Sequence, residues 1–334
     1  METVRTPAER FADLEDYPFA EHYADIDDGD GGTLRMHYVD EGAGELILCL
    51  HGQPSWSYLY RKMIPLLVEA GYRVVAPDLV GFGKSDKPTQ RSDYSYANHV
   101  GWMRRFLEKL DLRDITLVCQ DWGGLIGLRT VVEVPERYAR VVTANTGLPD
   151  ARGVPDEMAA PMREMLASIP ALPPEEMSAK LVENEHGAGF MYWIRYCDAY
   201  PEFRISDVIA LTRGGEPLTD AQRAAYDAPF PDEAYKQGAR QFPSLVPIFP
   251  DDPAVTANRA AWEFLATFDK PFLTAFSDRD PITRGAEKRF EAEVAGAQGQ
   301  PHTVIEGAGH FLQDEAPGPL VDAIDRFVKA NPLP

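Results

Sequence analysis

Short apolar segments alternate with segments of helical periodicity along the first 147 residues of the chain. The run LILCL at 46–50 has the length and composition of a buried strand, and the residues that follow it show helical spacing. The same order recurs twice more, and a fourth strand follows. Such alternation predicts an α/β fold built on a parallel sheet. In chain order the predicted elements are the strand 46–50, the helix 58–69, the strand 73–76, the helix 96–110, the strand 115–119, a helix ending at 134, and the strand 140–144.

The pattern changes after Gly147. Residues 150–235 contain many prolines and short helical pieces without a convincing strand, whereas strands are predicted again at 272–276 and 303–305, before a final helix at 319–329. A turn-rich stretch at 27–32 between two alternating segments also predicts an N-terminal hairpin. We therefore expect a core formed by residues 1–149 and 236–334, interrupted by a helical cap at 150–235.

Charge and cysteine content exclude several classes of protein. Acidic residues outnumber basic ones by 53 to 33, which gives a formal net charge of −20 and disfavours binding to nucleic acid or to an anionic membrane. Three widely spaced cysteines (Cys49, Cys119 and Cys197) form no disulfide framework. No segment approaches 18 apolar residues, and the N-terminus lacks an apolar leader. These features favour a cytoplasmic protein, which we expect to be monomeric.

The segment Val118-Cys119-Gln120-Asp121-Trp122-Gly123-Gly124 is the most informative motif. A predicted strand ends, an acidic residue follows, and a pair of glycines opens a helix, which is the pattern of a nucleophile elbow with aspartate in place of serine. The alternative interpretation is an N-cap aspartate followed by a core tryptophan.

Three further motifs favour the catalytic interpretation. His51-Gly52-Gln53-Pro54 follows a strand, where α/β hydrolases place an oxyanion loop. Asp278 and Asp280 follow the strand at 272–276, and His310 lies in Gly307-Ala308-Gly309-His310-Phe311 after the last strand. The order nucleophile, acid, histidine is that of α/β hydrolases. No His, Cys or carboxylate cluster has metal-ligand spacing, so we expect neither a metal nor a cofactor.

With these motifs the chain resembles the haloalkane dehalogenases of the α/β-hydrolase superfamily, and in particular the subfamily with two halide-binding tryptophans. The resemblance covers nearly the whole chain and includes the segments 51–56, 78–85 and 226–231. It implies an α/β-hydrolase fold, with a mostly parallel eight-stranded sheet flanked by helices. It also implies an enzyme that converts a small apolar halogenated substrate and water into a primary alcohol, halide and a proton.

The residue types fit this chemistry. Asp121 can displace halide from carbon and form an alkyl ester, and His310 can then activate the water that hydrolyses the ester. Asp280 would orient the histidine. The resemblance favours it over Asp278, because the family's acid usually falls four residues past the end of the strand core with a small residue three before it, as Asp280 and Ser277 do. The resemblance assigns the oxyanion hole to the backbone N–H groups of Gln53 and Trp122.

The resemblance also assigns halide binding to two indole N–H groups. Trp122 adjoins the nucleophile, and Trp193 lies in the context Phe190-Met191-Tyr192-Trp193, which is similar to the family's second halide-binding motif. An indole donates a hydrogen bond and cannot accept one, so it suits an anion. The alternative is that Trp193 belongs to the core of the cap.

Two other functions remain open. An epoxide hydrolase would use the same Asp-His-Asp triad with tyrosine acids from the cap, for which Tyr192, Tyr196 and Tyr200 are candidates. A catalytically silent receptor could share the fold. The remaining histidines lack a catalytic context, and we interpret them as surface or core residues; they are His22, His37, His99, His186 and His302.

Overall fold

The computed structural model describes residues 1–184 and 187–333. His186 therefore lies outside the described residues. The strands are β1 (Thr3–Val4), β2 (His22–Asp27), β3 (Thr33–Gly42), β4 (Leu46–Leu50), β5 (Arg73–Pro77), β6 (Lys87–Pro88), β7 (Ile115–Cys119), β8 (Tyr138–Thr143), β9 (Phe272–Ser277) and β10 (Thr303–Ile305). The α-helices are α1 (Met63–Glu69), α2 (Tyr96–Lys109), α3 (Trp122–Glu133), α4 (Ala159–Ser168), α5 (Pro174–Glu183), α6 (Gly189–Ala199), α7 (Ile205–Leu211), α8 (Asp220–Asp227), α9 (Gln237–Gln241), α10 (Val255–Leu265), α11 (Glu287–Glu293), α12 (Leu312–Glu315) and α13 (Pro317–Ala330).

An eight-stranded sheet forms the centre of the molecule, in the order β10-β9-β8-β7-β4-β5-β3-β2. Neighbouring strands from β10 to β5 are parallel, whereas β3 pairs antiparallel with β5 and β2 pairs antiparallel with β3. The predicted α/β fold, its mostly parallel eight-stranded sheet and its N-terminal hairpin are confirmed.

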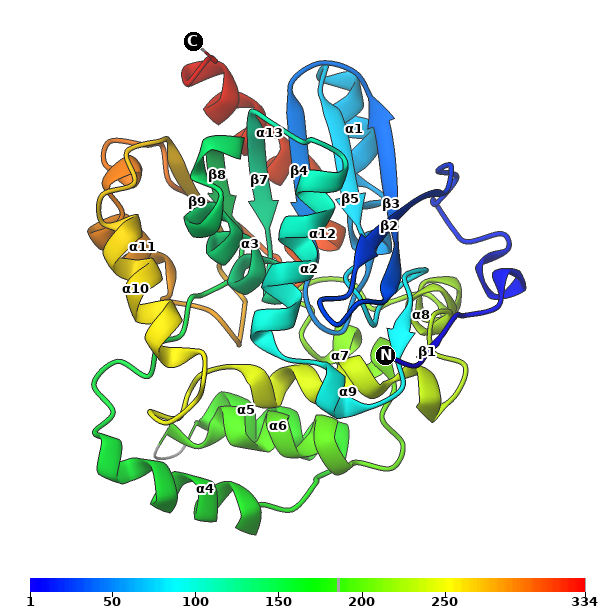
Figure 1. Ribbon diagram of the computed structural model, residues 1–334, viewed down its shortest axis with the longest axis vertical. Helices are drawn as coiled ribbons and strands as arrows, with labels where there is room; N and C mark the ends of the chain where they lie inside the picture. Colours follow the sequence, from blue (N-terminus) through cyan, green and yellow to red (C-terminus); the bar gives the residue numbers. More distant parts are fainter. Residues whose placement is uncertain (185–186, 334) are drawn as a thin grey trace.

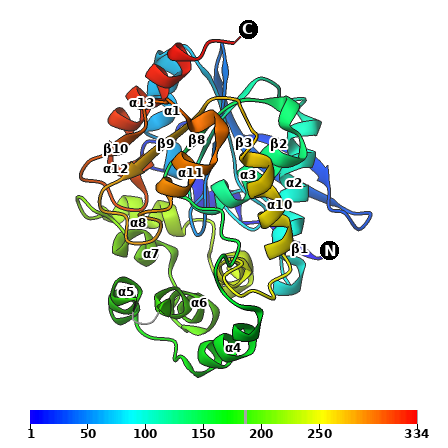
Figure 2. The same ribbon diagram turned by 90° about the vertical axis from the view of Figure 1, so that its left-hand side faces the viewer.

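Helices cover both faces of this sheet (Figure 2). α1 and α13 pack on one face, and α2, α3 and α10 pack on the other. Every residue of β4 and β7 is buried, which explains why these strands read as continuous apolar runs. In α13 the buried residues recur at three- and four-residue intervals, as expected for a helix with one face on a sheet.

The helix predicted at 58–69 ends at Glu69 as expected, but its predicted start is wrong. Residues Ser57–Tyr60 form a short 3₁₀ turn, and α1 begins only at Met63. The side chains of the turn are fully buried, and the Ser57 N–H donates to the buried carboxylate of Asp78. Tertiary contacts therefore override the helical periodicity at the start of this segment.

Helices α4 to α8 lie together beyond the carboxyl ends of the parallel strands (Figure 1). Within the described part of 150–235, no strand interrupts them. The loops that follow β4, β7, β8, β9 and β10 all open toward these helices, so residues far apart in sequence meet between the sheet and the helical layer.

Candidate active site

Asp121 lies at the sharp turn between β7 and α3. Its backbone has φ 49° and ψ −127°, an unfavourable conformation for a residue other than glycine. Gly123 lets the turn approach the neighbouring strand, because a Cβ there would lie 2.1 Å from the carbonyl oxygen of Leu50. The Asp121 N–H donates to the carbonyl of Asn145 at 2.9 Å, which ties the turn to the loop after β8.

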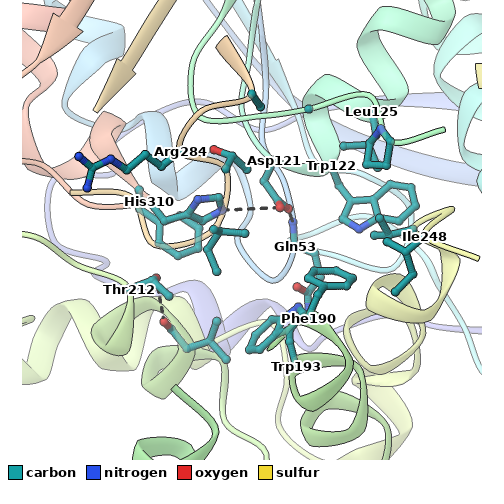
Figure 3. A pocket seen from close by; sticks show the side chains of 18 residues that line it. Gln53, Asp121, Trp122, Leu125, Phe190, Trp193, Thr212, Ile248, Arg284 and His310 are labelled. Carbon is teal, nitrogen blue, oxygen red and sulfur yellow. Dashed lines mark hydrogen bonds and ion pairs between the residues drawn. The ribbon is translucent and has the colours of Figure 1, made fainter. Parts of the chain in front are cut away.

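Two groups approach the Asp121 carboxylate. The backbone N–H of Gln53 donates to Oδ1 at 2.7 Å, and Nε2 of His310 lies 3.6 Å from Oδ2 (Figure 3). The Gln53 N–H comes from the loop after β4 and His310 from the loop after β10. The structure therefore brings three of the sequence-predicted site residues together at one end of the sheet.

Asp280 lies behind the imidazole of His310. Its Oδ1 is 3.0 Å from Nδ1 of His310, and its carboxylate also accepts the backbone N–H groups of Ile282 and Thr283. Asp280 is buried, whereas Asp278 is exposed and accepts the N–H of Gly307. Of the two candidate acids, Asp280 is the one that contacts the histidine.

Opposing effects set the pKa values of this pair. Burial alone lowers the pKa of His310, but the carboxylates of Asp280 and Asp121 outweigh burial and raise this pKa to about 10. For Asp280, burial raises the pKa, but His310 and the hydrogen bonds from Thr283 and Ile282 leave it below its usual value. The geometry thus favours an imidazolium beside two carboxylates while Asp121 is ionised.

An apolar cavity of about 350 Å³ opens in front of Asp121. Its lining includes Gln53, Trp122, Trp193 and His310 together with aliphatic and aromatic side chains such as Phe190 (Figure 3). Trp122 comes from the first turn of α3, and Trp193, only 7% exposed, comes from α6. Both predicted tryptophans therefore border the same cavity as Asp121.

The indole N–H groups divide the tryptophans into two sets. The indole N–H groups of Trp122 and Trp193 donate to no acceptor among the described residues. Neither nitrogen is fully buried, and both side chains line the cavity. The other three donate to backbone carbonyls: Trp56 to Ala225, Trp102 to Asp28, and Trp262 to Leu148.

Sequence reasoning missed two residues that contact His310. The side-chain nitrogen of Gln120 lies 2.9 Å from Nε2 and 3.3 Å from the carbonyl oxygen of His310. Asn145 donates its side-chain N–H groups to the carbonyls of Gly309 and His310. Gln120 could have been found as the neighbour of Asp121, and Asn145 as a polar residue just after the carboxyl end of a strand.

His51 has a structural position next to the site. Its Nδ1 lies 2.9 Å from the carbonyl oxygen of Gly52, and its Nε2 accepts the N–H of Leu79 at 2.9 Å. The two ring nitrogens therefore hold the loop that carries Gln53 against the segment after β5. Burial lowers the pKa of His51, which favours the neutral ring that these contacts require.

The three tyrosines that the sequence offered as acids for epoxide opening lie on α6 or directly after it. Tyr192, Tyr196 and Tyr200 are absent from the lining of this cavity in the part of the chain that the structure describes. Tyr196 instead stacks on Trp193, with ring centroids 5.8 Å apart, and on Tyr200 at 5.2 Å.

Across residues 1–184 and 187–333, no group of three or more His, Cys, Asp or Glu side chains is arranged to hold a metal ion. In the same residues, no helix combines the length and apolar character needed to span a membrane.

Comparison with known proteins decides the family. A model of the α/β hydrolase fold matches residues 45–204. A haloalkane dehalogenase of Psychrobacter cryohalolentis is 46% identical, over 99% of this chain and 100% of its own length. Haloalkane dehalogenase 1 of Mycobacterium tuberculosis is 47% identical, over 99% and 100%. The chain belongs to the haloalkane dehalogenases.

A solved structure supports this membership. The haloalkane dehalogenase of Paraglaciecola agarilytica, described as a tetramer, matches with a TM-score of 0.79 and 33% identity over 98% of this chain and 97% of its own. As a haloalkane dehalogenase, the chain is a hydrolase that acts on carbon–halogen bonds. The relatives favour this activity over the epoxide hydrolase alternative.

Proposed function

We propose that Asp121 is the nucleophile of this haloalkane dehalogenase. An ionised carboxylate needs no base in order to attack, so Oδ2 of Asp121 displaces the halide from a terminal carbon of the substrate. The carbon–oxygen bond of an ester forms, and the halide departs with the electron pair of the carbon–halogen bond. The Gln53 N–H, 2.7 Å from Oδ1, holds the other carboxylate oxygen during this step.

His310 acts in the second step. Formation of the ester removes the negative charge of Asp121, which is one of the causes that raise the pKa of His310. The imidazole can then lose its proton and take one from the water that attacks the ester carbonyl. Asp280 stabilises the imidazolium that results, and the N–H groups of Gln53 and Trp122 stabilise the oxyanion. The tetrahedral intermediate collapses, and the departing alkoxide takes the proton from the imidazolium to become the alcohol. The carboxyl group of Asp121, which now carries one oxygen from water, loses its proton to solvent and returns to the carboxylate.

Trp122 and Trp193 bind the departing halide. The observation that carries this assignment is that, among the described residues, only these two of the five tryptophans have an indole N–H without a protein acceptor, and both side chains line the apolar cavity. A bare anion is costly in such surroundings, and two donors offset that cost. We therefore propose the subfamily with two halide-binding tryptophans, for which Trp193 supplies the donor from the cap.

We also propose how the chain is divided into domains, which substrates it takes and in what state it works. Residues 150–235 act as a cap over a core of 1–149 and 236–334, and the 350 Å³ cavity between them takes apolar haloalkanes. The chain works as a cytoplasmic monomer without a cofactor. Light scattering in solution tests the monomer, because the Paraglaciecola relative is a tetramer.

Replacement of one indole tests the halide assignment. Trp193→Phe keeps most of the apolar surface and deletes one donor; a hydrogen bond to a charged group is worth roughly 1.5–3 kcal/mol, so cleavage should slow by about 10–150-fold. The matched control is Trp262→Phe, because the indole N–H of Trp262 donates to the carbonyl of Leu148 and is not available to a halide. This variant should keep the wild-type rate. Halide release from 1-bromobutane is the measurement. Equal rates in wild type and Trp193→Phe would refute the halide role.

A further inference from the structure

The carboxylate of Glu315 connects the loop of His310 to the helical layer. Glu315 ends α12, and its side chain is only 3% exposed. Oε2 accepts the N–H of Gly309 at 2.9 Å, and Oε1 accepts the N–H groups of Gly214 and Gly215 at 2.9 and 2.7 Å. Gly309 directly precedes His310. Gly214 and Gly215 lie in the 212–215 segment, which is the first part of the connection between α7 and α8.

The 212–215 segment also touches the histidine loop directly. The His310 N–H donates to the carbonyl of Thr212 at 2.8 Å. A Cβ on Gly214 would lie 2.6 Å from the nitrogen of Gly309, and a Cβ on Gly309 would lie 2.2 Å from the carbonyl oxygen of Thr212. The two backbones therefore meet without side chains between them. Thr212 also lines the active-site cavity (Figure 3).

Asp314, next to Glu315, anchors the same region. Its buried carboxylate lies 2.8 Å from the guanidinium of Arg61 in the core. It also lies 3.1 Å from the guanidinium of Arg213 and accepts the hydroxyl of Tyr226 at 3.1 Å, both from the proposed cap. Asp314 thus holds the helical layer to the core. Glu315 contacts backbone N–H groups on both sides of the junction, and its Oε1 also lies 3.9 Å from Nε of Arg213.

We propose that Glu315 is a positioning residue for His310. Its carboxylate clamps the 212–215 segment to Gly309 and so sets where the imidazole stands over the ester on Asp121. The inference rests on the proposed role of His310 as the base of the second step. Attack by Asp121 on the substrate does not use His310 as a base, so a fault in this clamp should affect ester hydrolysis and leave alkylation almost unchanged.

The substitution Glu315→Gln tests the clamp with little change in volume. An amide keeps one acceptor oxygen, so either Gly309 or the Gly214–Gly215 pair must face an NH₂ group, which cannot accept. A displacement of about 1 Å in a catalytic group can cost about 100-fold in rate, so we expect ester hydrolysis to slow by about 10–100-fold and alkylation to change by no more than about twofold.

The measurement separates the two steps. Rapid mixing with 1-bromobutane gives the halide burst, which reports alkylation. Quenching followed by intact mass spectrometry gives the amount of alkyl-enzyme, which reports hydrolysis. Glu108→Gln is the matched control. Glu108 is an exposed carboxylate on α2 that is far from the histidine in sequence, and it forms a 3.8 Å ion pair with Arg104 on the same helix. This control should match wild type in both steps.

Gly214→Ala tests the same junction from the other side if Glu315→Gln does not fold. The added Cβ forces the 212–215 segment away from Gly309 while the carboxylate stays. Accumulation of alkyl-enzyme in either folded variant, with an unchanged burst, supports the proposal. Equal slowing of both steps, or wild-type behaviour in both, overturns it, as does failure of both variants to fold. If wild type itself releases no halide, the proposed function fails instead.

Discussion

Asp121 combines a strained backbone with a half-buried carboxylate that lines the cavity, and these two properties arise from one turn. A positive φ at a residue other than glycine is costly, so the surrounding hydrogen bonds from Asp121 to Asn145 and from Gln53 to Asp121 must hold the turn.

Asp121→Asn keeps the shape of the side chain and removes its charge. We expect no halide release beyond background from a folded Asp121→Asn protein, measured by a halide assay with a thermal melt as control. Release at the wild-type rate would exclude Asp121 as the nucleophile.

His310 is the second residue whose role can be isolated. His310→Gln leaves the alkylation step intact but removes the base, so the variant should release up to about one halide per active site and then stall. Mass spectrometry of the stalled protein should find the alkyl group on Asp121. Steady turnover by this variant would contradict the assignment.

At the scale of single elements, the conformation of the loop after β9 determines which of its two carboxylates contacts His310. Asp280 is buried against the imidazole and accepts two backbone N–H groups, whereas Asp278 is exposed at Gly307. Asp280→Asn should therefore slow ester hydrolysis by at least about tenfold, since the imidazolium loses its charged partner, and Asp278→Asn should change it by less than about twofold. The reverse ranking in single-turnover hydrolysis would assign the acid to Asp278.

At the scale of the whole molecule, the perturbed pKa values predict how stability depends on pH. Burial raises the pKa of Asp280 and of Asp314, but their cationic partners leave both below the usual value, so the stability they contribute is present above about 3.9 and is lost as the pH falls. His310 has its pKa raised to about 10, so its contribution is complete below about 6.5 and is lost as the pH rises toward 10.

The contribution of Asp280, Asp314 and His310 to the free energy of unfolding should therefore be highest between about pH 4 and 6.5. Burial lowers the pKa of His99 to about 3 and that of Lys87 to about 7, and these two groups contribute stability that is instead lost as the pH falls. Denaturant titrations at pH 2.5, 5.5 and 9.5 provide the measurement. In His310→Gln the loss between pH 5.5 and 9.5 should be smaller than in wild type, whereas an identical loss in both proteins would show that His310 does not cause it.

The strand–helix order and the four motifs at strand ends were readable in the sequence, because buried parallel strands are continuous apolar runs and reactive residues gather at their carboxyl ends. Asp121, Asp280 and His310 could thus be predicted in their order. Other features of the site depend on which loops meet in space. They are the contact of Asp280 with His310, the contacts of Gln120 and Asn145 with His310, and the clamp formed by Glu315. These contacts join residues up to 190 positions apart, so no local pattern records them, and only the tertiary structure decided them.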